Sequence, residues 1–189
     1  MDRIKKKQIA LLVVENRRRY HEDYVRWLTK QLMFRKIQGV KFFDGKAITI
    51  WATRRQMINE VLEEHKDLTH VLFVDTDVIP PEGFVDTLFL HNTPLVSGFY
   101  ISPDEQNLPC SRKNGDYYTG KGLEEVDVFS MGASLIQREV LEKVEYPEAN
   151  KPHRLDADSE FCRKAKEFGY KIMQDFNLVC SHIGIKYYI

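Results

Sequence analysis

Runs of apolar residues divide the chain into expected strands and helices. Residues 9–14 and 71–74 are unbroken apolar runs, which are typical of strands covered on both faces in a parallel sheet. Residues 40–43 and 95–101 predict two more strands, and Gly98 is expected to loosen the second of them. Shorter, later strands are expected at residues 126–129, 170–173 and 178–180.

Between these strands, apolar residues recur at helical spacing. The spacing predicts amphipathic helices over residues 20–32 and 53–65. Short helices are expected after Pro81 and over residues 138–144, and a last helix is expected to open near Asp156. Strands that alternate with helices indicate an α/β fold with a mostly parallel central sheet flanked by helices. The last helix is expected to bury Phe161, Ala165 and Phe168 and to end at Gly169 as its C-cap.

Composition narrows the class of protein. The 189 residues are enough for one domain over residues 1–189. Charged residues make up 30% of the chain and apolar residues 43%, which indicates a folded globular protein. Lys+Arg and Asp+Glu are both 28, so the basic excess of a nucleic-acid-binding protein is missing. The three cysteines are widely spaced, which argues against a disulfide framework and favours a cytoplasmic protein, in the host cytoplasm if the chain is viral. The sequence predicts neither a signal peptide nor a transmembrane segment.

The motif Asp75-Thr76-Asp77 follows the apolar run of residues 71–74. Residues i and i+2 of an extended chain point to the same side, so the two carboxylates are expected to face one site. Because neighbouring carboxylates repel each other, a divalent cation with a phosphate-bearing ligand is their usual partner. An acidic turn without a ligand is the simpler interpretation. The position after a buried mid-chain strand favours a site, since ligands of open α/β sheets bind at the carboxyl ends of strands.

Two later segments are further candidates. Residues 102–122 are polar and contain Asn114-Gly115, the strongest hairpin signal in the chain. This segment is predicted to form a hairpin or a mobile flap over the site, or else an ordinary surface excursion. Small residues at positions 130–134 allow the backbone to approach a ligand closely.

The order of these motifs resembles the GT-A fold of nucleotide-sugar-dependent glycosyltransferases, especially the large inverting group. The resemblance covers nearly the whole chain and implies a Rossmann-like fold, with a nucleotide-sugar-binding half at residues 1–101 and an acceptor-side half at residues 102–189. The compact length is similar to that of stand-alone enzymes of prokaryotes and their viruses, including small glycosyltransferases of archaeal viruses. The motifs lie at residues 71–81, 96–100, 130–144 (SMGASLIQREVLEKV) and 158–172 (DSEFCRKAKEFGYKI).

On the donor side, the resemblance implies that Asp75 faces the ribose or nucleotide and that Asp77 binds Mn²⁺ or Mg²⁺ on the diphosphate. His182 lies where many members place a late metal ligand, and Asp75 is a further candidate ligand. Arg54 matches a nucleotide-side arginine, although it could simply cover a surface. The other donor-binding residues implied by the resemblance are Val14, Glu15, Asn16, Arg17 and Thr76.

On the acceptor side, Asp158 matches the second residue of the family's Glu-Asp pair, the general base. Ala157 replaces the first residue of that pair, so Asp156 and Glu160 are also candidates for the base. A helix N-cap is the common structural role for Asp at such a position. The turn that lines the acceptor side is matched by Met131, Gly132 and Ala133.

The resemblance therefore implies metal-dependent transfer of a sugar from a nucleoside-diphosphate sugar to a hydroxyl of a glycan, glycoprotein or lipid-linked acceptor, with inversion. A haloacid-dehalogenase-type Mg²⁺-dependent phosphatase also carries Asp-x-Asp after an apolar strand. That family usually places the motif on the first strand and follows it with Gly-Thr, whereas Val78-Ile79 follows here. A nucleotidyltransferase and a non-catalytic nucleotide- or sugar-binding module are two more classes that could carry such a motif.

Overall fold

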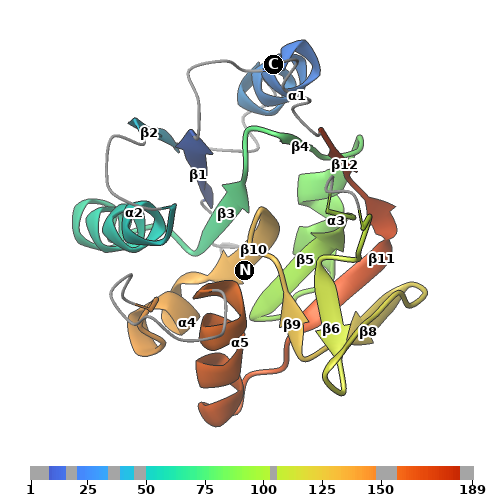
Figure 1. The fold of residues 1–189 in the computed structure, drawn as a ribbon. Helices are drawn as coiled ribbons and strands as arrows, with labels where there is room; N and C mark the ends of the chain where they lie inside the picture. The colour runs from blue at the N-terminus through green and yellow to red at the C-terminus, as the bar shows by residue number, and fades with distance from the viewer. Residues whose placement is uncertain are drawn as a thin grey trace, which may run out of the picture.

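The computed structural model describes residues 9–15, 21–33, 39–44, 50–102, 106–147 and 157–183. Its centre is a seven-stranded sheet, shown in Figure 1. The strands are β1 (Ile9–Glu15), β2 (Gly39–Asp44), β3 (His70–Val74), β5 (Leu95–Phe99), β8 (Leu123–Glu125), β10 (Ala133–Gln137) and β11 (Met173–Val179). Their order is β2-β1-β3-β10-β5-β11-β8, with β10 and β8 antiparallel to the other five. The mostly parallel α/β sheet predicted from the sequence is confirmed.

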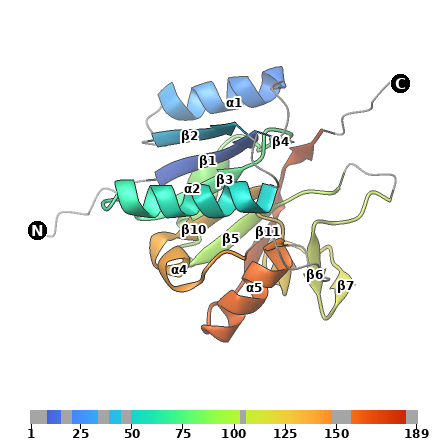
Figure 2. The same ribbon diagram turned by 60° about the vertical axis from the view of Figure 1, so that its left-hand side comes forward.

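Helices cover both faces of this sheet, as Figures 1 and 2 show. The helices are α1 (Glu22–Met33), α2 (Ile50–Glu64), α3 (Phe84–Leu90), α4 (Arg138–Lys143) and α5 (Ala157–Glu167). One hydrophobic cluster joins α2, α4 and α5 to the sheet, and a second cluster joins α1 and α3 to it. In β3, Val71 and Phe73 belong to the first cluster, whereas Leu72 and Val74 belong to the second. This alternation explains the unbroken apolar run, because both faces of β3 are buried.

Two small sheets are added at one end of the main sheet. The first pairs β4 (Val78–Ile79) with β12 (Ser181–His182), and the second has the order β7 (Asp116–Tyr117), β6 (Ser111–Lys113), β9 (Val128–Phe129). Asn114 and Gly115 have positive φ values of 55° and 87° and connect β6 to β7. The hairpin predicted from Asn114-Gly115 is therefore confirmed.

Gly98 lies within β5, where a side chain would disturb the packing. A Cβ atom there would lie 2.6 Å from the ring of Phe84 in α3 and 2.9 Å from the Leu178 carbonyl oxygen in β11. The glycine thus lets two neighbouring elements approach β5 closely, which is a common reason for glycine inside a strand.

Three expectations about the later part of the chain were wrong. Residues 126–129 do not form one strand, because the chain passes there from β8 in the main sheet to β9 in the small sheet. Residues 170–173 and 178–180 are not two strands, because β11 covers residues 173–179 with an irregularity between Asp175 and Val179. Phe168 is 60% exposed rather than buried.

The exposure of Phe168 follows from how α5 ends. Gly169 has a φ of 84°, its N–H donates to the Lys166 carbonyl, and the Tyr170 N–H donates to the Ala165 carbonyl. This is the Schellman pattern, so the predicted C-cap is confirmed and turns the chain just after Phe168. Within the described residues, no helix combines the length and apolar character needed to cross a membrane.

Candidate functional site

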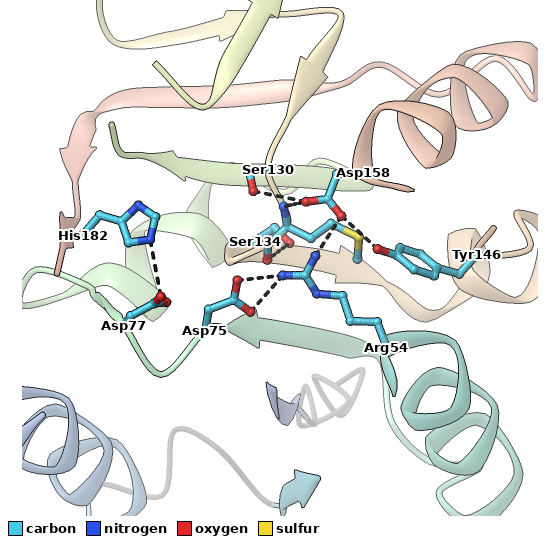
Figure 3. A network of polar contacts seen from close by, with 9 residues as sticks. Arg54, Asp75, Asp77, Ser130, Ser134, Tyr146, Asp158 and His182 are labelled. Atoms are coloured by element: carbon cyan, nitrogen blue, oxygen red, sulfur yellow. Dashed lines mark hydrogen bonds and ion pairs between the residues drawn. The ribbon is translucent and has the colours of Figure 1, made fainter. Parts of the chain in front are cut away.

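Three separate parts of the chain meet at the carboxyl end of β3. The Asp75 N–H donates to the Gly132 carbonyl at 3.0 Å, which joins this end of β3 to the turn before β10. The Ile183 N–H donates to the Asp77 carbonyl at 2.8 Å, and His182 pairs with Val78 between β12 and β4. The fold therefore brings Asp75 and Asp77 together with residues from the far end of the described chain (Figure 3).

Arg54 of α2 lies between two carboxylates at the centre of this site (Figure 3). Its Nη2 donates to both oxygens of Asp75 at 2.8 and 2.7 Å, and its Nη1 donates to Oδ1 of Asp158 at 2.8 Å. Only 4% of the Arg54 side chain is exposed. Burial lowers the pKa of the guanidinium, but the carboxylates of Asp158 and Asp75 outweigh burial and raise that pKa well above its ordinary value. Arg54 is thus a buried cation that two carboxylates share, and the three groups together carry one formal negative charge.

Asp158 lies in the first turn of α5 and accepts hydrogen bonds from four groups. Oδ1 accepts from Arg54 and from the Tyr146 hydroxyl at 2.9 Å, while Oδ2 accepts from the Met131 N–H at 2.9 Å and the Ser130 hydroxyl at 3.1 Å. A carboxylate has about four acceptor positions, so this one is saturated. Of these four bonds, the one from Ser130 is the longest. A further hydroxyl can therefore reach Asp158 most easily by replacing Ser130.

Arg54 binds the Asp75 carboxylate, and the lack of a side chain at Gly132 leaves room for that carboxylate. A Cβ atom at Gly132 would lie 2.6 Å from Oδ2 of Asp75 and 2.6 Å from the Tyr100 hydroxyl oxygen. Burial raises the pKa of the Asp75 carboxyl group, and Arg54 offsets part of this effect. Burial and the charge of Asp75 also raise the Tyr100 pKa well above its ordinary range, so Tyr100 stays a neutral hydroxyl.

Asp77 is more open than Asp75 and faces His182. Its side chain is 40% exposed, and Oδ2 lies 3.7 Å from Nε2 of His182. The other ring nitrogen, Nδ1, lies 3.1 Å from the Ile101 carbonyl oxygen, and the ring packs edge-on against Tyr100. Burial lowers the pKa of His182, but Asp77, the Cys110 side chain and the Ile101 carbonyl together raise it to about 10. These contacts favour the protonated imidazole of His182 beside Asp77.

The residues near Asp77 fit a divalent cation that is completed by a ligand. No group of three or more His, Cys, Asp or Glu side chains within the described ranges could hold a metal ion by itself. Asp77 and His182 offer one oxygen and one nitrogen, and the Nδ1 contact with a carbonyl leaves Nε2 directed at Asp77. Mg²⁺ is commonly held by one or two carboxylates together with substrate phosphates, and an imidazole ligand shifts the preference toward Mn²⁺.

The other residues expected at the site are distributed as follows. Val14 and Glu15 end β1, which runs parallel to β3, so they lie at the same edge of the sheet as Asp75. Thr76 is half-buried in the turn between Asp75 and Asp77, and Ala133 is buried in β10. Glu160 forms an ion pair with Arg163 at 2.7 Å on the surface of α5. Asn16, Arg17 and Asp156 lie outside the described residues.

Sequence reasoning missed Tyr146 and the role of Ser130. Both donate to Asp158, and Tyr146 comes from the segment that follows α4. Burial and the neighbouring Asp158 raise the Tyr146 pKa well above its ordinary value, which keeps this hydroxyl a donor. The small residues at positions 130–134 gave a signal for Ser130. No local pattern marks Tyr146, because its partner Asp158 lies in another element.

Similarity to known proteins is confined to three-dimensional structure. No model of a known protein family matches the chain, and no curated protein sequence is significantly similar to it. Protein A197 from STIV has a TM-score of 0.69 at 19% identity, over 94% of this chain and 86% of that one.

Two glycosyltransferase structures are also similar. The catalytic domain of Drosophila beta1,4galactosyltransferase 7, in complex with xylobiose, has a TM-score of 0.60 at 16% identity, over 97% of this chain and 73% of that one. GalNAc-T7 with UDP, GalNAc and Mn²⁺ has a TM-score of 0.58 at 9% identity, over 94% of this chain and 44% of that one. These similarities confirm the GT-A-like fold that the sequence predicts.

The ion pairs of Arg54 lead to a prediction about stability. Arg54→Met leaves two buried carboxylates without their cation, so the free energy of unfolding should fall by about 3–5 kcal/mol in urea titrations. Arg55→Met is the matched control, because Arg55 is next in sequence and pairs with the exposed Glu145. The control should lose less than about 1 kcal/mol. Similar losses in the two variants would contradict the central position given to Arg54.

The raised pKa of His182 predicts a pH dependence in the metal-free protein. Since the folded state favours the protonated imidazole, the stabilisation is complete below the ordinary histidine pKa of about 6.5. It is lost as the pH rises through the folded-state pKa of about 10. An NMR titration of the ring should give a pKa near this value for the wild type and a lower one for Asp77→Asn. A wild-type pKa at or below the ordinary value would show that Asp77 and His182 do not interact as described.

Proposed function

We propose that the chain transfers a sugar from a nucleoside-diphosphate sugar to an acceptor hydroxyl. One observation carries this proposal: in a GT-A-like fold, Arg54 joins the first carboxylate of Asp75-Thr76-Asp77 to the Asp158 carboxylate of α5. A motif suited to a diphosphate and a candidate base are thereby held in one site. The UDP, GalNAc and Mn²⁺ bound to GalNAc-T7 and the xylobiose bound to the galactosyltransferase support sugar transfer as the class of reaction.

In this proposal the donor lies at the carboxyl ends of β1 and β3. Residues 1–101 would form the donor half, with the nucleotide near Val14, Glu15, Asn16, Arg17 and Thr76. Asp77 and His182 would hold Mn²⁺ or Mg²⁺, and His182 would release its proton when it becomes a ligand. A cation held there would supply positive charge to the leaving diphosphate.

The role of Arg54 differs from the nucleotide contact that the family resemblance implies. Both of its Nη atoms are engaged by carboxylates, and its side chain is almost fully buried. Arg54 would therefore act on the donor through Asp75, whose carboxylate it orients. Because Arg54 already engages both oxygens of Asp75, Asp77 is the carboxylate available for a metal.

Residues 102–189 would form the acceptor half. Met131, Gly132 and Ala133 would line its turn, where the Met131 N–H binds the base Asp158. The acceptor oxygen forms a bond to the anomeric carbon, and the bond from that carbon to the diphosphate oxygen breaks. The electron pair of the broken bond leaves with the nucleoside diphosphate. Oδ2 of Asp158 takes the acceptor proton after the acceptor hydroxyl has replaced Ser130 as its partner. Attack from the face opposite the leaving group inverts the anomeric centre.

A donor-binding module without transfer is the second candidate. The observation that favours it is the saturation of Asp158 by four hydrogen bonds, because a base in that state accepts no further proton until one bond breaks. The two candidates share the donor site and differ in whether the Asp158 carboxylate reacts.

The donor site and the base can be tested separately. Nucleoside diphosphates with Mn²⁺ should stabilise the wild type against heat, by roughly 2.7 kcal/mol at about 100 times the dissociation constant. Asp77→Ala should lose this shift. Asp158→Asn should keep the shift but lose transfer to an acceptor, since an amide cannot take the proton. Loss of both in an Asp158→Asn protein that still unfolds cooperatively in urea would contradict the assignment of the base.

A further inference from the structure

A cavity of about 290 Å³ opens beside Asp158 on the side of the three-stranded sheet. Ser130 and Asp158 line it together with Arg112 of β6 and Tyr117 of β7. Figure 2 shows that β6 and β7 lie on the same side of the molecule as α5, which carries Asp158. The volume is near the lower end for small-molecule sites, about 300 Å³, so the cavity suits one terminal unit of a ligand.

Arg112 is the cation that lines this cavity. The charged side chains that line it are those of Arg112 and Asp158, and Asp158 is already paired with Arg54. Within the described part of the chain, Arg112 has no carboxylate partner. The next residue, Lys113, contrasts with it, because its Nζ pairs with Glu124 at 3.3 Å.

The position of Arg112 is fixed before any ligand binds. β6 is the central strand of its sheet, and Arg112 pairs with Tyr117 on one side and Val128 on the other. Its guanidinium carbon lies 5.1 Å from the centre of the Tyr117 ring, and Tyr117 itself is 50% exposed. A guanidinium stacked on an aromatic ring loses less side-chain entropy on binding, and its planar donors match carboxylates and phosphates.

We propose that this cavity receives the acceptor and that Arg112 selects an acceptor whose terminal sugar carries a carboxylate or a phosphate group. The inference rests on the proposed glycosyl transfer, because that reaction places the acceptor hydroxyl beside Ser130 and Asp158. The exposed face of Tyr117 offers an apolar surface to the same sugar unit. A neutral acceptor would leave the charge of Arg112 without a partner in the cavity.

Binding of matched sugars tests the selection directly. The probes are glucose, glucuronic acid and glucose phosphate, titrated into the full chain by calorimetry with and without UDP and Mn²⁺. At least one charged sugar should bind about tenfold more tightly than glucose, a difference of about 1.4 kcal/mol. A preference for glucuronic acid alone identifies a carboxylate acceptor, and a preference for glucose phosphate alone identifies a phosphate acceptor.

The variants assign the preference to Arg112. Arg112→Gln should abolish it, whereas Arg112→Lys should keep part of it, since a lysine retains the charge without the planar fork. Lys121→Gln is the matched control, because it removes one exposed positive charge that lies outside the lining of the cavity. Three results would overturn the proposal. The wild type could bind all three sugars equally, it could bind none of them, or Arg112→Gln could keep the full preference for a charged sugar.

Failure of this inference is distinguishable from failure of the proposed function. If nucleotide stabilisation and transfer occur but neutral and charged acceptors are used equally, only the role of Arg112 is wrong. If no nucleotide stabilises the chain while the Arg112-dependent preference for a charged sugar persists, the cavity still binds anions, but the proposed glycosyl transfer is wrong.

Discussion

The buried guanidinium of Arg54 is the interaction on which the arrangement of the site depends. It comes from α2 and binds Asp75 after β3 and Asp158 in α5, so it connects three elements that are far apart in the sequence. Removing a buried cation from between two carboxylates would leave both uncompensated. The same contact therefore stabilises the fold and fixes the distance between the proposed donor and acceptor sides.

The contacts of Arg54 explain why the two aspartates of Asp75-Thr76-Asp77 are not equivalent. Asp75 is oriented by Arg54 and packed against Gly132, while Asp77 is open to solvent and faces His182. A cation bound to a diphosphate would therefore meet Asp77 first. On the opposite side of Arg54, Asp158 is held by four donors, and the cavity beside it is lined by the positive charge of Arg112.

The sequence predicted features that depend on local physics. The strand at β3 and the hairpin at Asn114-Gly115 are correct, because burial of both faces of β3 and positive φ angles in the turn leave clear local signals. The division of residues 123–129 into β8 in the main sheet and β9 in a small sheet was missed, because sheet membership depends on distant partners. The pairing of Arg54 with Asp158 spans 104 positions and has no local pattern, so its role as a bridge became visible only in three dimensions.

Donor turnover with water as the acceptor would show directly whether Asp77 and a divalent metal act on a nucleoside-diphosphate sugar. A panel of nucleoside-diphosphate sugars would be incubated with Mn²⁺ and the wild type or Asp77→Ala, and release of the nucleoside diphosphate would be followed by mass spectrometry. If Asp77 holds the metal on the donor diphosphate, at least one donor should release its nucleoside diphosphate in a reaction that depends on both the metal and Asp77. This release is the result expected of the proposed glycosyl transfer. Release at the same rate in both proteins for every donor, or release of phosphate from phosphomonoesters instead, would contradict it.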